Sequence, residues 1–296
     1  MRYILERVRK IATELKENVY TNKLEIKEYR IKEGNFLGID AVNRDESEWK
    51  YYNSDEQWGG TDDRHFWFRT SVTVPEEFDG KVLGLDLYAF EEGWDAVNPQ
   101  FILYVNGEHI QGLDINHREV ILTHNAKVGE TYEIDLHSYT GRTYDAKLNL
   151  HGSLVAIDLE TRDLYFNLQV PVWCCEKLDE DDKKRIDMLK VLNEAINLLD
   201  LRKVFSKEYK ESIKKANEFL EIEFYEKLCG HEDSIATCVG HTHIDVAWWW
   251  TVAQTREKVG RSFSTVLKLM EEYPEYIFMS SQPQLYKFIK EDYPDI

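Results

Sequence analysis

Hydrophobic residues recur every three or four positions over residues 3–20, with charged residues between them. This spacing places the apolar side chains on one face of a helix and the charges on the other. The polar face carries glutamate as well as lysine and arginine, which favours a packing face over a membrane-binding one. The apolar stripe consists of Ile4, Val8, Ile11, Leu15 and Val19.

From about residue 24 to 160 hydrophobic and polar positions alternate, which is typical of strands with one buried face. Turn-forming residues such as Asn106-Gly107 and Gly129 separate these runs. Six or more short strands with such spacing favour an antiparallel β-sandwich of the jelly-roll, galactose-binding-like type. Strands are expected near residues 66–74, 83–89, 101–105, 132–136, 147–150 and 154–159.

After Glu160 the spacing becomes helical. Residues 164–173 are ambiguous, because Pro171 would kink a helix running through them. Two clearer stripes predict an antiparallel helical pair joined by a short turn at residues 201–205. The first stripe contains Ile186, Leu189, Leu192 or Asn193, Ile196 and Leu199, and the second contains Tyr209, Ile213, Ala216, Leu220 and Phe224.

The last 60 or so residues alternate strand and helix patterns. Residues 235–239 predict a buried strand, and a capping-box pattern at 251–254 begins a helix. Residues 276–280 predict a second strand, after which Pro283 opens a second helix. This order is how an α/β barrel begins. The predicted organisation is therefore a multidomain α+β chain with an N-terminal helix (1–23), a β-sandwich (24–161), a helical connector (162–230) and the first βαβα units of a barrel (231–296).

The candidate chemistry lies where the strand at 235–239 ends. Successive side chains of extended backbone alternate faces, so His241, His243 and Asp245 are expected to project the same way. Imidazole and carboxylate are good ligands for a zinc-like cation, and two or three of them leave a coordination position open. The alternative is that these residues only hydrogen-bond the backbone at a strand end; the position favours chemistry, because α/β enzymes place their active sites there.

Composition narrows the classes of function. The net charge of −18 opposes nucleic acid and anionic membranes as partners. No apolar run approaches the roughly 20 residues of a membrane span, and residues 1–8 lack an apolar signal core. The four cysteines show no metal-type spacing, which favours reduced, mostly buried thiols in a cytoplasmic protein.

Two stretches of the predicted sandwich are rich in aromatic and polar residues, and each has two possible roles. Residues 58–69, with Trp58, His65 and Trp67, could stack on a sugar from an exposed position or fill an interface with the C-terminal part. We favour the interface. Residues 91–95 pose the same choice, with calcium as a weaker possibility.

The C-terminal motif resembles a known family. The run from His241 to Trp248, with Arg256 and residues 261–264, 270–276 and 281–286, is similar to the start of the catalytic domain in glycoside hydrolase family 38, the zinc-dependent α-mannosidases of the cytosolic and bacterial branch. About 60 residues match densely, and the preceding 230 match only in layout. That layout favours a helix with a break at Pro171.

The resemblance implies roles for individual residues. His243 and Asp245 would bind one zinc ion, Trp248 would line the sugar subsite, and His241 would support the ligands without binding the metal. Trp249 and Trp250 are expected to pack the barrel or its rim, and Arg256 to lie on a helix surface or anchor the site by an ion pair.

The implied reaction is hydrolysis of terminal α-linked mannose from oligosaccharides with retention of configuration. The family's nucleophile and acid/base carboxylate come later in the chain than residue 296, so we expect these residues to be an amino-terminal piece that is inactive alone, and a homo-oligomer is possible. Two alternative functions are also consistent with the sequence. An amidohydrolase-type enzyme would use His241 as a ligand, and the sandwich could by itself be a non-catalytic carbohydrate-binding or assembly module.

Overall fold

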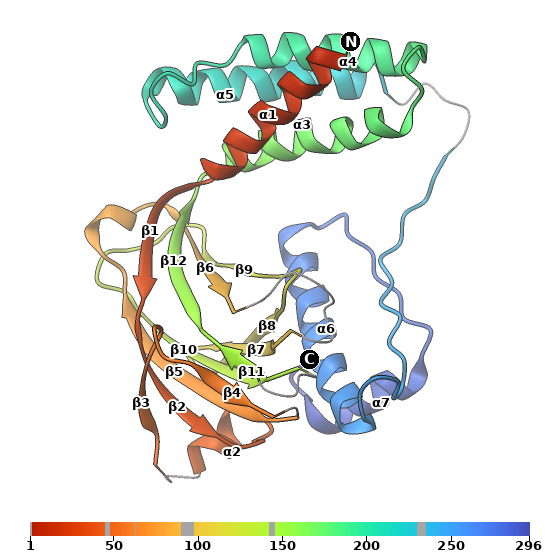
Figure 1. Ribbon diagram of the computed structural model, residues 1–296. Helices are drawn as coiled ribbons and strands as arrows, with labels where there is room; N and C mark the ends of the chain where they lie inside the picture. The colour runs from red at the N-terminus through yellow and green to blue at the C-terminus, as the bar shows by residue number, and fades with distance from the viewer. Residues whose placement is uncertain (1, 45–47, 62, 90–97, 142–145, 230–234) are drawn as a thin grey trace. The chain divides into compact units, whose positions relative to one another are not determined.

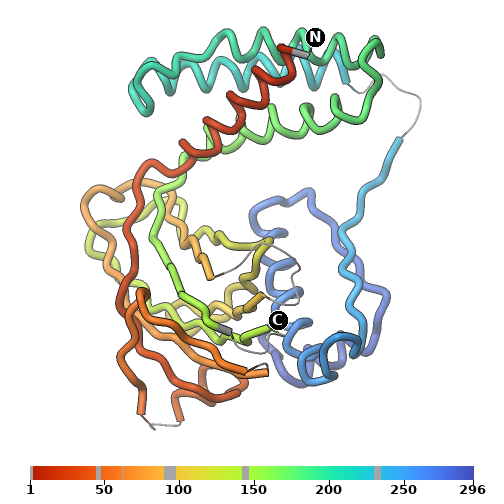
Figure 2. The backbone as a smooth tube through the Cα atoms, in the orientation of Figure 1, coloured from red at the N-terminus to blue at the C-terminus, as the bar shows by residue number. Residues whose placement is uncertain are grey.

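The computed structural model describes residues 2–44, 48–61, 63–89, 98–141, 146–229 and 235–296. The chain forms two compact units. One comprises Met1–Lys23 with Val155–Ala236, and the other comprises Leu24–Leu154 with Thr237–Ile296. Figure 1 labels the elements and Figure 2 follows the backbone.

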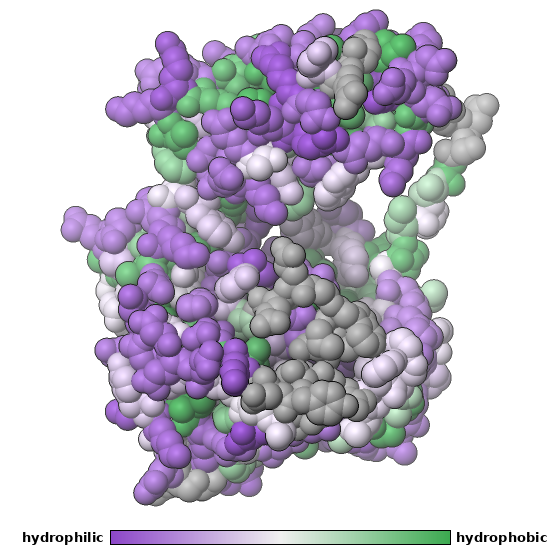
Figure 3. All heavy atoms as spheres, viewed as in Figure 1, coloured by the Kyte–Doolittle hydropathy of each residue, from purple (hydrophilic) through white to green (hydrophobic). Residues whose placement is uncertain are grey.

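The first unit is helical. Its helices pack around a core of buried aliphatic residues together with Tyr209 and Phe224, and hydrophilic side chains cover most of its visible surface (Figure 3). Asp158 and Ser206 cap two of the helices by accepting hydrogen bonds from the backbone amides of Thr161 and Tyr209. The elements are α1 (Arg2–Glu17), α3 (Leu159–Lys177), α4 (Lys183–Asn197), α5 (Lys207–Leu220) and the π-helix η3 (Glu221–Glu226).

The predicted N-terminal helix and helical pair are confirmed, but the predicted break at Pro171 is wrong. Helix α3 continues through Pro171 to Lys177. The proline ring is buried on the packed face beside Leu168 and Val172. Tertiary packing on this face offsets the missing hydrogen bond of the proline nitrogen.

The second unit contains the antiparallel sheets. A six-stranded sheet has the order β3-β2-β5-β10-β7-β8, a four-stranded sheet has the order β1-β12-β6-β9, and β11 pairs with β4. The turn between β7 and β8 has positive φ at Asn106 and Gly107 (53° and 84°), as the sequence predicts. The strands are β1 (Tyr20–Ile26), β2 (Glu28–Glu33), β3 (Lys50–Asn53), β4 (Trp58–Gly60), β5 (His65–Thr73), β6 (Val82–Tyr88), β7 (Gln100–Val105), β8 (Glu108–Leu113), β9 (Glu119–Thr123), β10 (Thr131–Tyr139), β11 (Ala146–Leu148) and β12 (His151–Ile157), with two short helices, α2 (Ile39–Arg44) and η1 (Glu76–Phe78).

The first four residues of strand β5, residues 65–68, are buried on both faces. Phe66 and Phe68 point to one side, where their rings meet Trp58 edge-on at 5.5 and 5.0 Å. Trp67 points to the other side and shares a core cluster with Ile244 and Val259 of the C-terminal segment. The antiparallel, β-rich middle of the chain is thus confirmed, while its jelly-roll connectivity stays a prediction.

The C-terminal segment contains the two predicted helices, α6 (Val252–Glu272) and α7 (Pro283–Asp292). The two predicted strands are wrong. Residues 235–239 form no strand, and residues 276–280 take part in a single parallel bridge, between Phe278 and Gly240. Val239 is 44% and Ile277 60% exposed, so the apolar residues of these runs lack the burial that extends a strand pair.

Two further expectations concern the whole chain. All four cysteines are free thiols, but Cys174 and Cys238 are exposed, so the expectation of mostly buried thiols is wrong. No helix in the described part of the chain combines the length and hydropathy that crossing a bilayer requires.

Helix α6 lies close against the edge strand β8 (Figure 1). The backbone amide of Gly112 donates to Thr265 Oγ1 at 3.2 Å, and the same hydroxyl lies 3.3 Å from the Gly112 carbonyl oxygen. A Cβ at position 112 would lie 2.7 Å from Arg261 Cβ and 2.8 Å from the Arg261 carbonyl oxygen. The absence of a side chain at Gly112 therefore permits this close approach.

We expect Gly112→Ala to lower the free energy of unfolding by about 1–3 kcal/mol, because the added methyl group overpacks this contact. Chemical denaturation measures the change. Glu108→Ala, at an exposed position of the same strand, is the control and should change stability little. Equal stability of Gly112→Ala and the unsubstituted chain would contradict the contact.

His109 in β8 predicts a pH dependence. Burial lowers the pKa of His109 to about 4, and its ring lies 5.1 Å from Tyr104 and 5.8 Å from Tyr293. An unfolded histidine takes up a proton near pH 6.5. Between pH 6.5 and 4 the unfolded state therefore binds more protons, and the free energy of unfolding falls as the pH is lowered.

Replacing His109 by phenylalanine should reduce this slope, because the ring is kept and the titrating group is lost. Urea unfolding at several pH values between 4 and 7 tests it. His124→Gln, at an exposed position, should leave the slope unchanged. A slope unaffected by His109→Phe would show that other groups cause the dependence.

Candidate metal centre

The segment that carries the candidate ligands begins at Gly240. The Gly240 amide donates to the Ile277 carbonyl oxygen at 2.6 Å, and the Met279 amide donates to the Gly240 carbonyl oxygen at 2.8 Å. A Cβ at Gly240 would overlap the Tyr276 hydroxyl. Four residues later Ile244 is fully buried among Trp67, Val259 and other residues of the shared core cluster.

The structure brings together two of the predicted ligands. His243 Nε2 lies 3.0 Å from Asp245 Oδ1, and the two side chains are 70% and 48% exposed. Their chemistry fits two of the positions that zinc requires. His241 is also exposed, but within the described ranges no group of three His, Cys, Asp or Glu residues is placed to hold a metal ion.

The loop after Asp245 is held by its own hydrogen bonds. The Ala247 amide donates to Thr255 Oγ1, and Trp250 Nε1 donates to the Asp245 carbonyl oxygen, both at 3.1 Å. Ala247 has a φ of 63°, in the left-handed region. These contacts fix the backbone between the ligand Asp245 and the beginning of α6.

Three tryptophans follow in this loop. Trp248 is 62% exposed and its ring lies edge-on to those of Trp249 and Trp250. Trp250 is partly buried, with Lys258 Nζ 4.5 Å from its ring centroid. Trp249 is 52% exposed, and the expectation that it and Trp250 pack the barrel or its rim stays a prediction. Trp248 is accessible to a ligand.

Arg256 connects the two helices. Its guanidinium donates to Asp292 at 2.5 and 2.6 Å and to Glu291 at 2.9 Å, and it lies 4.4 Å from the Phe288 ring centroid. These carboxylates raise the pKa of Arg256 above its usual value. Arg256 therefore binds α6 to α7, and its bonds are with α7 rather than with His243 or Asp245.

A buried polar cluster between the sheet and α6 was not predicted from the sequence. Glu257 accepts a hydrogen bond from Asn35 Nδ2 at 3.2 Å, and its other oxygen lies 3.0 Å from His65 Nε2. Gln254 Nε2 is 3.3 Å from the same ring nitrogen. On α6 these polar residues recur at helical spacing with Arg261, a pattern that usually indicates a solvent-exposed face.

Burial by itself would raise the pKa of Glu257, but the hydrogen bond and electrostatic interaction with His65, together with the positive charge of Arg261, lower it below its usual value. Glu257 is thus a carboxylate in the folded protein. His137 stays neutral, because burial lowers its pKa to about 3. The buried negative charge of Glu257 is thus offset by the positive charge of Arg261 on the same helix.

The residues of 58–69 belong to this interior. Trp58 and Trp67 are buried, and the Trp67 ring stacks on His137 at 4.8 Å. Neither tryptophan is accessible to a sugar in solvent. The interface interpretation is confirmed for Trp67, which shares a core cluster with Ile244 and Val259, and for His65, which contacts Glu257. Trp58 instead packs against Phe66 and Phe68 on the opposite side of β5. Residues 91–95 lie outside the described residues.

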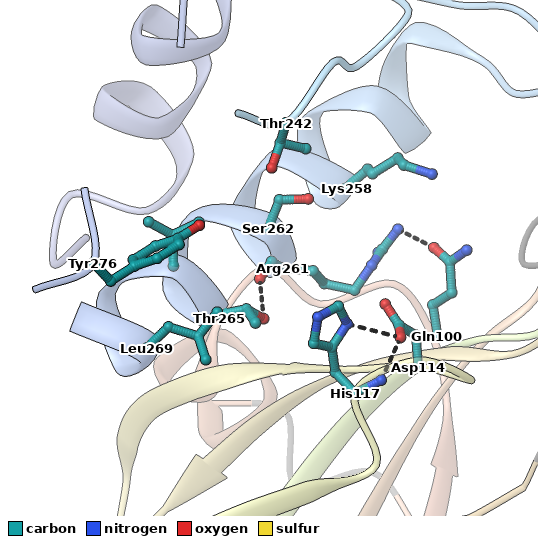
Figure 4. A pocket seen from close by; sticks show the side chains of 11 residues that line it. Gln100, Asp114, His117, Thr242, Lys258, Arg261, Ser262, Thr265, Leu269 and Tyr276 are labelled. Carbon is teal, nitrogen blue, oxygen red and sulfur yellow. Dashed lines mark hydrogen bonds and ion pairs between the residues drawn. The ribbon is translucent and has the colours of Figure 1, made fainter. Parts of the chain in front are cut away.

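A polar pocket of about 170 Å³ lies between the ends of β7 and β8, α6 and Thr242 (Figure 4). His117 Nδ1 is 3.1 Å from Asp114 Oδ1, and Arg261 donates to Gln100 Oε1. Thr242 precedes His243, and its side chain faces α6 while those of His243 and Asp245 are exposed. Of residues 241–245, the pocket lining includes Thr242 and neither candidate ligand.

A sequence model described as "Glycosyl hydrolases family 38 N-terminal domain" matches residues 234–296. Residues 234–296 are therefore similar to the N-terminal domain of glycosyl hydrolase family 38, and we call them the family 38 segment. The match begins just before the candidate ligands and includes α6 and α7, so His243, Asp245 and Trp248 all lie in the family 38 segment.

Three relatives extend the similarity upstream. "Alpha-mannosidase G" of Dictyostelium discoideum is 26% identical over 252 residues, which cover 78% of this chain and 22% of that protein. "Alpha-mannosidase 2C1" of Homo sapiens is 26% identical over 248 residues, with the same shares. "Alpha-mannosidase" of Saccharomyces cerevisiae is 31% identical over 154 residues, covering 49% of this chain and 14% of that protein. The first two matches span about a fifth of the relatives' length.

Among solved structures, a β-glucuronidase from Ruminococcus gnavus aligns with 47% of this chain and 30% of that chain. The identity is 12% and the TM-score 0.33. The similarity is too low to support an argument about fold or function.

The buried carboxylate of Glu257 should contribute measurably to the stability of the folded chain. We expect Glu257→Gln to lower the free energy of unfolding by about 3 kcal/mol, because it leaves the buried guanidinium of Arg261 beside a neutral amide. Thermal or urea unfolding of the chain tests it.

Glu271→Gln is the matched control on the same helix. Glu271 is exposed and pairs with Lys268 at 3.1 Å, so its loss should cost less than about 1 kcal/mol. Similar effects of the two substitutions would show that Glu257 does not stabilise the contact between α6 and the sheet.

Proposed function

We propose that this chain supplies part of the active site of a zinc-dependent, retaining α-mannosidase that hydrolyses terminal α-linked mannose from oligosaccharides. The observation that carries the proposal is the 3.0 Å approach of His243 and Asp245 on an accessible surface. The family 38 match of the same segment supports it, as do the α-mannosidase relatives. The described residues supply two candidate metal ligands, one exposed aromatic ring and the hydrogen bonds that hold the loop between them.

His243 and Asp245 would hold the zinc ion through Nε2 and a carboxylate oxygen. Bound zinc supplies Lewis-acid binding of sugar hydroxyls, which favours the flattened ring of the oxocarbenium-like transition state. His241 would support this pair without binding the metal.

Trp248 would stack on the mannose ring. Its indole is largely exposed, two neighbouring indoles lie edge-on to it, and it follows Asp245 by three positions. Aromatic rings pack well against the apolar faces of other rings while leaving polar edges free.

The architecture of the family 38 segment fits the first units of a barrel. The bridge between Gly240 and Phe278 is parallel, and α6 connects its two partners, as a βαβ unit requires. We propose that residues 231–296 begin an α/β barrel, that 24–161 form a jelly-roll sandwich and that 162–230 connect them.

Zinc titration of the chain tests the ligand pair. We expect one zinc ion to bind per chain, with binding weakened at least tenfold by His243→Ala and by Asp245→Ala, because each removes one of two protein ligands. Isothermal titration calorimetry measures both values. His124→Ala, at an exposed histidine elsewhere, is the matched control.

His241→Ala separates the proposal from an amidohydrolase-type site. A ligand at position 241 would make that substitution as damaging as His243→Ala, whereas a supporting role predicts a smaller effect. Zinc binding that is insensitive to substitution of both His243 and Asp245 would overturn the proposed site.

A further inference from the structure

Ile244 lies between the two proposed ligands and has no exposed surface. Because neighbouring side chains of extended backbone point in opposite directions, burial of Ile244 turns His243 and Asp245 outward together. The direction of both ligands therefore depends on how the backbone at Ile244 is held. The nearest bridge to another segment in the described chain is at Gly240, four residues earlier.

The side chain of Gln282 takes the place of a neighbouring strand. The Ile244 amide donates to Gln282 Oε1 at 3.2 Å, and Gln282 Nε2 donates to the Ile244 carbonyl oxygen at 2.8 Å. A carboxamide offers the same donor and acceptor as a peptide group, so this pair of bonds copies one rung of a sheet ladder. These two hydrogen bonds join residues that lie 38 positions apart in the sequence.

Gln282 occupies a position where this contact does not compete with another. It is the N-cap residue of α7, and its side chain makes no capping hydrogen bond. Pro283 follows in the first turn of the helix and has no amide hydrogen that needs a partner. Both polar atoms of the Gln282 side chain are thus used on Ile244.

We propose that Gln282 is a positioning residue that aligns His243 and Asp245 for metal before the metal binds. The inference rests on the proposed function of this pair as zinc ligands. Thr255 holds the other end of the segment, through its bonds with the Ala247 amide and with Trp250 Nε1. Between these two supports the ligand backbone has little freedom, so less conformational entropy is lost when metal binds.

Zinc titration of the chain with Gln282→Leu tests the inference. Leucine fills a similar volume but makes neither hydrogen bond, so zinc should bind roughly tenfold more weakly, as for other outer-shell partners of metal ligands. Amide hydrogen exchange at Ile244 should accelerate in the same variant, a change that does not depend on metal. Gln282→Glu keeps the size and the acceptors but removes the donor, and it tests the inference if the leucine variant does not fold.

Gln284→Leu is the matched control. Gln284 is exposed in the first turn of α7, so this substitution should change neither zinc binding nor exchange at Ile244. Zinc binding through His243 and Asp245 that is unaffected by Gln282→Leu or Gln282→Glu would overturn this inference alone. An unsubstituted chain whose zinc binding does not involve His243 and Asp245 would overturn the proposed function and this inference together.

Discussion

The charge of Glu257, buried between α6 and the six-stranded sheet, is the constraint on which the C-terminal segment depends. An isolated carboxylate in such a place would cost several kcal/mol. The sheet supplies His65 and α6 supplies Arg261, while Asn35 donates a further hydrogen bond. These groups act as partners only when α6 lies in one position on the sheet, so the pairing selects a register as well as satisfying a charge.

This register determines where the candidate ligands lie. Val259 and Phe263 of α6 share a core cluster with Ile244 and with Trp67 of the sheet, and Thr255 on the same helix holds the loop after Asp245. The six-stranded sheet therefore provides the packing surface for the family 38 segment. This contact explains why Trp67 is buried, whereas Trp58 is buried against Phe66 and Phe68 on the opposite side of β5.

Much of this arrangement could be predicted from the sequence, because it depends on local periodicity. The helices at α1, α4, α5, α6 and α7 follow their apolar stripes and caps, and the approach of His243 to Asp245 follows from the alternation of an extended segment. The unbroken α3 could not be predicted, because packing around Pro171 overrides its local preference. Nor could the contacts of His65 with Glu257 or of Gln282 with Ile244, since each joins residues far apart in sequence. Gln282 precedes a proline at a helix start, a pattern that predicts the helix but not the side chain's partner.

The single parallel bridge at Gly240 also affects how the chain will behave in solution. Val239, Ile277 and Met279 flank this bridge with exposed apolar side chains. Edges of this kind are templates on which further extended segments add, whether from the same polypeptide or from another molecule. These exposed apolar residues thus favour self-association, which the strong negative charge of the chain opposes by electrostatic repulsion at low ionic strength.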